Sequence, residues 1–387
     1  MKSRMEWLAI TGILAVTFNF TNPAAAQNEV IRSLYVSSAT VATNVEDIRT
    51  FPAPSADFNA LVASDEQLAA YGYPPRPDKT ENPDHYRLWE RVVSAARHRW
   101  NGDLKPLSIS RERTTGVDAM ARQERDVNPT PAVATTPQTY NWSGVALTNT
   151  LKKFSPGSFV DIYSLISVPV SQPPFGVGCS DTHYELSWMG LDGFTKLASI
   201  QPGAGKAALM GGLVSWTTCS SADALYYLMI GWDPNYVQTV FAVKPGDIVY
   251  AEVTAPQNGT GSNYMFLEDL TTLTYNAYSI PVPTGITFVG SSAEWIVSRY
   301  CCHSSGYPYP LPNTTAIFFD GGAAMKGNGA YTYLGSTAVT TQVISMVDDT
   351  GSQIIEEVNQ GSAGYEGQHG IFFQTANCAW SGGCTEK

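Results

Sequence analysis

A single carboxylate interrupts an apolar stretch that is otherwise typical of a buried β-strand. Glu294 stands in the sequence Ser291-Ser292-Ala293-Glu294-Trp295-Ile296-Val297. Burying an ionised carboxylate is costly unless it is paired or hydrogen-bonded, so this position predicts either a structural ion pair or a catalytic acid or base. Side chains alternate along a strand, so one face would carry Ser292, Glu294, Ile296 and Ser298, and the other Ala293, Trp295 and Val297. The second face suits a core and the first suits a site.

Other hydrolytic chemistries find little support in the sequence. It lacks a Gly-x-Ser-x-Gly elbow, a His-Glu-x-x-His helix and a Gly-x-x-x-x-Gly-Lys phosphate loop. One Asp-Thr-Gly triplet, Asp349-Thr350-Gly351, is better explained as a hairpin turn than as half of an aspartic protease site. Because His183, His303 and His369 are isolated and Cys-x-x-Cys pairs are missing, we expect no metal and no cofactor.

Charge is distributed unevenly along the chain. Residues 136–387 hold 8 lysines and arginines against 18 aspartates and glutamates, whereas residues 27–135 hold 13 against 15. An acidic body repels phosphate, so nucleic-acid binding is disfavoured. We expect a monomer whose partners are proteins or peptides.

The first 26 residues have the pattern of a secretory signal. Lys2 and Arg4 precede an apolar stretch that ends near Phe20, and Ala24-Ala25-Ala26 supplies a cleavage site. The apolar stretch is too short to span a membrane, so we predict a secreted or periplasmic protein without a membrane anchor. The cysteines predict three disulfides, in which the adjacent Cys301 and Cys302 have different partners; they are Cys179, Cys219, Cys301, Cys302, Cys378 and Cys384.

Residues 27–135 differ in character from the rest and are interpreted as a partly helical prosegment. A short helix is predicted from Ser64 to Tyr71, and a second from about Asp84 to Trp100. The second carries a basic stripe of Arg87, Arg91, Arg97 and Arg99, which is either a solvated face or a surface that docks electrostatically on the acidic body. The linker at residues 128–137, rich in proline and threonine, is a plausible cleavage zone, and we expect acid to free the prosegment.

Residues 136–387 consist of short alternating strands rich in β-branched and aromatic residues, separated by Gly, Pro, Asn and Asp. Long amphipathic helices are missing. This pattern predicts an all-β, two-sheet antiparallel β-sandwich formed by a single domain.

Four motifs in this body resemble those of the glutamic peptidases, the eqolisins, in order and spacing. They are Asn141-Trp142-Ser143-Gly144, Trp188-Met189-Gly190-Leu191-Asp192-Gly193, Lys244-Pro245-Gly246-Asp247 and Ala293-Glu294-Trp295-Ile296. The resemblance spans about residues 140–375. It implies a concanavalin A-like sandwich, made as a zymogen, that hydrolyses peptide bonds at acidic pH with a glutamate and a glutamine.

Carried over to this sequence, the resemblance implies that the catalytic residues are Glu294 and Gln201. In a competing register the glutamine position is occupied by Met210, and the pair is broken. The resemblance also implies that Trp142, Trp188 and Asp192 bind substrate; for the two tryptophans, plain core packing is an equal alternative.

The implied chemistry needs an activated water and a stabilised oxyanion. Glu294, ionised in the free enzyme, would take a proton from water and return it to the leaving nitrogen, while Gln201 would orient the water and donate to the oxyanion. Two departures from the family pattern stand out: Pro202 directly after Gln201, and a missing carboxylate in the stretch Tyr226–Trp232. The alternative function is a catalytically inactive β-sandwich that binds peptide or carbohydrate in the same cleft.

Overall fold

The computed structural model describes most of the body and part of the N-terminal region. The described residues are Tyr35, 38–107, 138–139, 141–174, Cys179, 182–194, 208–233, 237–300, 309–326, 331–332, 339–348, 354–360 and 371–377. The predicted signal segment, the linker at residues 128–137, Gln201 and four of the cysteines lie outside this set. Within it, no helix is long and apolar enough to cross a membrane.

Two helices and four short strands lie N-terminal to the body. The helices are α2 (Asp65–Tyr71) and α3 (Pro83–Ala95), and the strands are β1 (Val41–Ala42), β2 (Arg49–Thr50), β3 (His98–Arg99) and β4 (Lys105–Pro106). Helix α2 confirms the prediction: Ser64 forms a capping box with Gln67, and Gly72 ends the helix in the left-handed conformation. The second predicted helix is shorter than expected, because the chain after Ala96 pairs as β3 with the body.

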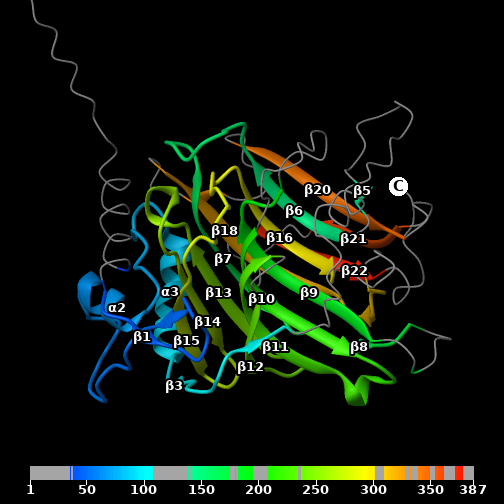
Figure 1. The fold of residues 1–387 in the computed structure, drawn as a ribbon, viewed down its shortest axis with the longest axis horizontal. Helices are drawn as coiled ribbons and strands as arrows, with labels where there is room; N and C mark the ends of the chain where they lie inside the picture. Colours follow the sequence, from blue (N-terminus) through cyan, green and yellow to red (C-terminus); the bar gives the residue numbers. More distant parts are fainter. Residues whose placement is uncertain are drawn as a thin grey trace, which may run out of the picture.

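The body is a β-sandwich, as predicted. Its strands are β5 (Gln138–Thr139), β6 (Trp142–Thr148), β7 (Phe159–Ser167), β8 (Ser171–Gln172), β9 (His183–Leu191), β10 (Ala208–Thr217), β11 (Leu225–Asp233), β12 (Gln238–Ala242), β13 (Ile248–Thr254), β14 (Tyr264–Asp269), β15 (Thr274–Ser279), β16 (Ser292–Arg299), β17 (Asn313–Thr314), β18 (Ile317–Met325), β19 (Tyr331–Thr332), β20 (Thr340–Val347), β21 (Ile354–Gln360) and β22 (Ile371–Asn377). Figure 1 shows the strands and the two helices beside them.

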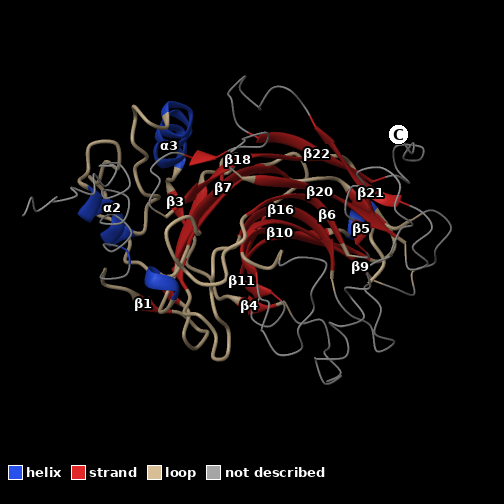
Figure 2. Cartoon of the chain, turned by 90° about the horizontal axis from the view of Figure 1, so that it is seen from above, coloured by secondary structure: helices blue, strands red, loops and turns tan. Residues whose placement is uncertain are grey.

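The strands form two curved antiparallel sheets. The inner sheet has the order β4-β12-β11-β10-β9-β16-β6-β20, and the outer sheet has the order β2-β15-β14-β13-β7-β18-β22-β21-β20. Strand β20 belongs to both, because it pairs with β6 over its first part and with β21 at its end. Figure 2 shows the sheets as nested arcs, with β10 and β16 on the inner arc and β7, β18 and β22 on the outer one. The concave face of the inner sheet therefore points away from the sandwich core.

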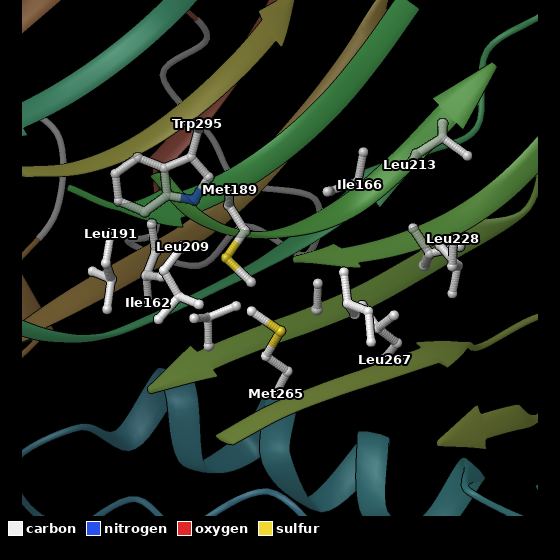
Figure 3. Close-up of a cluster of buried hydrophobic side chains, with 14 of the residues drawn as sticks. Ile162, Ile166, Met189, Leu191, Leu209, Leu213, Leu228, Met265, Leu267 and Trp295 are labelled. Carbon is white, nitrogen blue, oxygen red and sulfur yellow. The ribbon is translucent and has the colours of Figure 1, made fainter. Parts of the chain in front are cut away.

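The core fills the space between the arcs. Met189, Leu209 and Leu213 of the inner sheet face Ile162, Ile166 and Met265 of the outer sheet in one buried cluster (Figure 3). Close approach of β6 to β16 depends on Gly144, since a Cβ built there would lie 2.1 Å from the carbonyl oxygen of Trp295. This explains the glycine of the first motif.

Residues 38–107, here called the N-terminal cap, cover the side of the outer sheet that faces away from the core. Helix α3 buries Leu88, Trp89 and Val92 in an apolar cluster that includes Tyr163 and Phe266 of the body. The cap also adds β4 to the edge of the inner sheet at β12.

The described contacts of the basic stripe do not support electrostatic docking. Arg87 pairs with Asp84 of its own helix. Arg99 donates to the carbonyl oxygens of Pro52, Tyr71 and Phe51, all within the cap. These two arginines are thus engaged within the cap, and the contact between cap and body includes a large apolar cluster.

Cys179 and Cys219 form a disulfide that joins the segment before β9 to the segment after β10. The expected pairings of Cys301, Cys302, Cys378 and Cys384 lie outside the described residues.

The core generates a stability prediction. Leu213 is 1% exposed between the sheets, whereas Leu225 is 46% exposed at the start of β11. We expect Leu213→Ala to lower the free energy of unfolding by about 2–5 kcal/mol, because it removes buried methyl groups and leaves a cavity. Urea denaturation of Leu213→Ala and of the exposed control Leu225→Ala measures the difference; equal losses would contradict this assignment of the core.

Candidate active site

Glu294 lies in the middle of the inner sheet. Strand β16 runs between β6 and β9, and Glu294 is paired with Ala146 on one side and Gly190 on the other. Its neighbours on alternate positions confirm the predicted division of faces: Trp295 joins the core between the sheets, and Ile296 joins a separate cluster on the concave face. Glu294 therefore points to the concave face, where its side chain is fully buried.

No cation of the described residues lies against the carboxyl group of Glu294. Neither oxygen makes a hydrogen bond of ordinary geometry with a described residue. Burial raises the pKa of Glu294 well above its usual value, and the nearby Asp192 raises it further; the Ser292 hydroxyl and the backbone of Phe194 lie close enough to lower it only in part. The sequence predicts an ionised carboxylate in the free protein, but these surroundings favour the protonated acid at acidic pH.

The chain between β9 and β10 begins and ends beside this carboxyl. Gly193 has a positive φ of 103°, and a Cβ built on it would lie 3.1 Å from Oε1 of Glu294 and 2.8 Å from the Cβ of Ala208. The predicted partner, Gln201, belongs to the segment between Phe194 and Ala208 and lies outside the described residues. Both ends of the segment that carries Gln201 are thus adjacent to Glu294.

Met210, the residue of the competing register, lies on the same face of the sheet. It is paired with Gly190, which is itself paired with Glu294, so the three residues form one row across β10, β9 and β16. Met210 is fully buried in the concave-face cluster. Gly190 has no side chain, and the ring of Trp188 fills the space above it: a Cβ built on Gly190 would lie 2.9 Å from Cζ3 of Trp188.

Asp192 has a positioning role. Its carboxylate accepts hydrogen bonds from the backbone N–H groups of Val289 (2.6 Å), Gly290 (3.0 Å) and Ser291 (2.6 Å) and from the Ser291 hydroxyl (3.0 Å). These donors occupy both carboxylate oxygens of Asp192. Asp192 follows the last residue of β9 and has a positive φ of 62°. The predicted substrate-binding Asp192 therefore ties β9 to the segment that leads into β16.

The two predicted tryptophans meet on the concave face. Their rings are packed edge to face, with centroids 5.3 Å apart. The indole N–H of Trp188 donates to the hydroxyl of Ser298 at 3.0 Å, and Trp188 is buried, whereas Trp142 is partly exposed. Trp188 therefore packs beneath Trp142, and Trp142 is the member of the pair that has solvent-accessible surface.

Further aromatic residues on this face were not singled out from the sequence. Trp216 of β10 stacks on Tyr227 of β11 with centroids 5.3 Å apart, and Tyr184 of β9 packs against Tyr309. Alternation along the three strands is a signal that could have found them, since Trp216 is paired with Tyr184. They extend the aromatic lining away from Glu294 along the sheet.

Glu185, another buried acid of β9, has the opposite orientation. It is paired with Ser215 and Arg299, accepts a hydrogen bond from the Thr314 hydroxyl at 3.0 Å, and lies on the core side of the sheet. Burial raises the pKa of Glu185 to about 8. It is thus a chemically similar carboxyl outside the site.

The described residues contain no group of three or more His, Cys, Asp or Glu side chains that could hold a metal ion. Around Glu294 the neighbouring groups are aromatic, apolar, hydroxyl and amide, together with Asp192. The chemistry available here is proton transfer by a carboxyl group.

Comparisons with known proteins give one family and several solved structures. The model of the Peptidase A4 family matches residues 140–360. Scytalido-glutamic peptidase, solved with a transition-state analogue inhibitor, is 19% identical; the match covers 62% of this chain and 98% of that chain, with a TM-score of 0.46. SCP-B, described as an eqolisin in complex with the tripeptide Ala-Ile-His, is 18% identical over the same shares, with a TM-score of 0.43.

Aspergilloglutamic peptidase from Aspergillus niger is 18% identical; the match covers 50% of this chain and 99% of that chain, with a TM-score of 0.39. A search of curated proteins finds no match. The family model covers more than half of the sequence and includes the strands on both sides of Glu294. The chain therefore belongs to the Peptidase A4 family, that of the glutamic peptidases.

Proposed function

We propose that this protein is an acid endopeptidase in which Glu294 and Gln201 hydrolyse peptide bonds without a metal. The observation that carries the proposal is the buried carboxyl of Glu294, which faces the concave side of the sheet with both oxygens unpaired among the described residues. Such a group is expensive to maintain, and the described residues around it offer no structural partner that would explain it. A bound water molecule and the scissile amide supply the partners that it lacks.

The proposed cycle starts from the protonated carboxyl that burial favours. As water attacks the scissile carbonyl carbon, one oxygen of Glu294 gives its proton to the carbonyl oxygen while the other takes a proton from the water. The result is a neutral gem-diol and a protonated Glu294. The carboxyl then gives its proton to the leaving nitrogen and takes one from a gem-diol hydroxyl, so the C–N bond breaks and the acid is regenerated.

Gln201 is proposed to orient the water through its amide oxygen and to donate an N–H to the developing oxyanion. The support is positional: the segment that contains Gln201 leaves and rejoins the sheet next to Glu294, at Gly193 and Ala208. Met210 has only a thioether at its end, which is a weak acceptor and no donor, so it cannot perform this role.

The substrate class is proposed from the lining of the concave face. Partly exposed aromatic side chains, including Trp142 and Trp216, offer broad apolar contacts for an extended peptide. Export and processing complete the proposal: residues 1–26 direct secretion, and cleavage between the N-terminal cap and the body yields the mature enzyme. A peptide- or carbohydrate-binding protein without activity is the remaining candidate, favoured only by the same aromatic lining.

Replacing the proposed acid tests the function directly. We expect Glu294→Gln to reduce kcat/KM on an unfolded protein substrate at pH 3–5 by about a hundredfold to ten-thousandfold, because the amide cannot transfer a proton. Glu185→Gln changes a carboxyl of the same sheet on its other face and should retain activity. Turnover by Glu294→Gln equal to that of the unaltered protein would eliminate the proposal, provided that the circular dichroism of both variants is unchanged.

The identity of the second residue is tested by a pair of variants. We expect Gln201→Ala to lower kcat by about a hundredfold or more, the cost of one oxyanion donor, and Met210→Leu to leave it nearly unchanged. Single-turnover rates on a quenched fluorescent peptide give the comparison. If Gln201→Ala is as active as the unaltered protein, the glutamine does not take part.

The pH dependence follows from the burial of Glu294. Its pKa is raised in the folded protein, and the proposed cycle needs the protonated form, so kcat/KM should be constant in acid and fall as the pH rises through that pKa. A pH–rate profile from pH 2.5 to 8 measures this. A rate that instead increases from pH 4 towards neutrality would show that the ionised carboxylate is the reactive form.

A further inference from the structure

The side of the outer sheet that faces away from the core is covered by the N-terminal cap and does not take part in the proposed catalysis. The cap contributes Phe51, Leu68, Trp89 and Val92 to the shared apolar cluster, and the body contributes aromatic residues from four neighbouring strands, namely Tyr163, Tyr250, Tyr264, Phe266 and Tyr275. In Figure 2, α3 lies outside the outer arc, next to β7 and β18. The contact is continuous and apolar, like an interface between subunits.

Main-chain and hydroxyl contacts fix the position of the cap. Strand β2 pairs with β15 on one side, and β3 pairs with β15 in parallel. The Tyr264 hydroxyl donates to the carbonyl oxygen of Gly72 at 3.3 Å, and the hydroxyls of Tyr73 and Tyr275 lie 3.1 Å apart. The ring of His85 stacks on Tyr163 with centroids 3.8 Å apart.

Three carboxyl groups lie on the covered face. Glu252 of β13 is paired with Tyr163 and Phe266, Glu268 of β14 is paired with Tyr250 and Tyr275, and Asp161 of β7 is paired with Thr254. Their neighbours in these rows belong to the cluster that the cap covers. Glu252 and Glu268 are completely buried, and Asp161 is 5% exposed.

Glu252 and Glu268 are not paired with cations of the described residues. Glu252 accepts a hydrogen bond from the Tyr250 hydroxyl at 2.6 Å, and its other oxygen is unpaired; both oxygens of Glu268 are unpaired. Asp161 accepts from the Tyr331 hydroxyl at 2.7 Å. The titratable and charged groups that face the two glutamates are Asp161, Tyr250, Tyr264, Asp269, Tyr331 and, from the N-terminal side, Tyr35, Tyr73 and His85.

Arg99 is a cation of the cap that lies beside this face. It lies 5.8 Å from the centre of the Tyr275 ring, and its guanidinium donates to backbone carbonyls of the cap. It does not form an ion pair with Glu252 or Glu268.

We propose that the N-terminal cap is a docked partner of this face, that it remains bound after the chain is cut between residues 107 and 138, and that it is released when the pH rises, which is the reverse of the release by acid expected from the sequence. In the docked arrangement Glu252 and Glu268 must be uncharged, because they are buried and no cation of the described residues pairs with them. Release exposes them to water, where they ionise freely.

The direction of the pH effect follows from two carboxyls. Burial raises the pKa of Glu252 and Glu268 well above the usual value, and the nearby Asp161 adds to the shift of Glu252, as Asp269 does for Glu268. After release both return towards about 4.3. The docked state therefore binds more protons, and its affinity falls as the pH rises above that value, by about tenfold per pH unit for each group.

His85 acts in the opposite direction over part of the range. Burial lowers its pKa to about 3 in the docked state, so release allows it to take up a proton below about pH 6.5. Between about pH 4.3 and 6.5, the proton that His85 takes up on release offsets the proton lost by one of the two carboxyls. Above about pH 6.5 His85 takes up no proton, and the release of two protons by the carboxyls is not offset. The tyrosines stay protonated throughout, because burial raises the pKa of Tyr35, Tyr250, Tyr264 and Tyr331 well above 10.

The test uses the full chain carrying Glu294→Gln, with a recognition sequence for a site-specific protease inserted at residues 128–137. After cleavage, size-exclusion chromatography at pH 4.5 should show the cap co-eluting with the body, and the dissociation constant should increase by about a hundredfold or more between pH 5.0 and 7.5. Glu252→Gln/Glu268→Gln should not lose affinity as the pH rises; because His85 alone then changes its protonation, this variant should bind the cap up to about thirtyfold more tightly at pH 7.5 than at pH 5.0. Glu185→Gln, a buried acid away from the cap, should retain the pH dependence.

Three results would overturn the proposal: separation of the cap at every pH, release favoured by acid, or an unchanged pH dependence in the double variant. If the cap remains bound at every pH, its affinity is compared instead by the urea concentration that releases half of it. Equal urea concentrations at pH 4.5 and 7.5 would then contradict the proposal. If the double variant does not fold, the slope of log Kd against pH is measured for the protein with Glu252 and Glu268 intact. That slope gives the number of protons released when the cap dissociates. The readouts need no hydrolysis, so they are independent of the proposed function.

Discussion

The hydrogen bonds of Asp192 fix the geometry of the whole candidate site. One carboxylate holds three consecutive backbone N–H groups and a hydroxyl of residues 289–291, directly before β16 begins. It stands at the end of β9, followed by Gly193, whose missing side chain lets the chain pass close to Glu294. The same residue therefore sets the position of β16 and the departure point of the segment that contains Gln201. The order Asp-Gly in the motif follows from these two requirements.

Buried carboxyls with a raised pKa are a repeated feature of this acidic protein. Glu294 lies on the concave face, Glu185 in the core, and Glu252 and Glu268 beneath the cap, and burial raises the pKa of all four. A raised pKa means that the folded state binds more protons, so each group contributes stability in acid that is lost as the pH rises. A fold with such groups in three separate places is matched to acidic surroundings throughout.

The sequence allowed the sandwich, the α2 boundaries and the face of Glu294 to be predicted, because these depend on alternation, capping and turn residues that act over a few positions. Trp295 and Ile296 show this clearly, since period two alone assigns them to opposite faces. The end of α3 could not be predicted, because residues 98–99 pair with β15, a partner 176 positions away in the chain. The positioning role of Asp192 was also hidden, since its donors lie about 100 positions later. The apolar cluster between cap and body was not predicted either, since its members come from residues 35–96 and from strands more than 60 positions later.

Strand β4 closes one border of the inner sheet with only two residues, a lysine and a proline paired with Gln238 and Thr239 of β12. An uncovered border strand offers unpaired N–H and C=O groups to any extended chain, and proline and lysine are residues that discourage such pairing. While β4 is in place, the Gln238–Ala242 strand is shielded from other molecules. Detachment of β4 would expose unpaired backbone N–H and C=O groups at the edge of β12, with which another extended chain could pair. By covering this edge, the N-terminal cap also guards against association between copies of the protein.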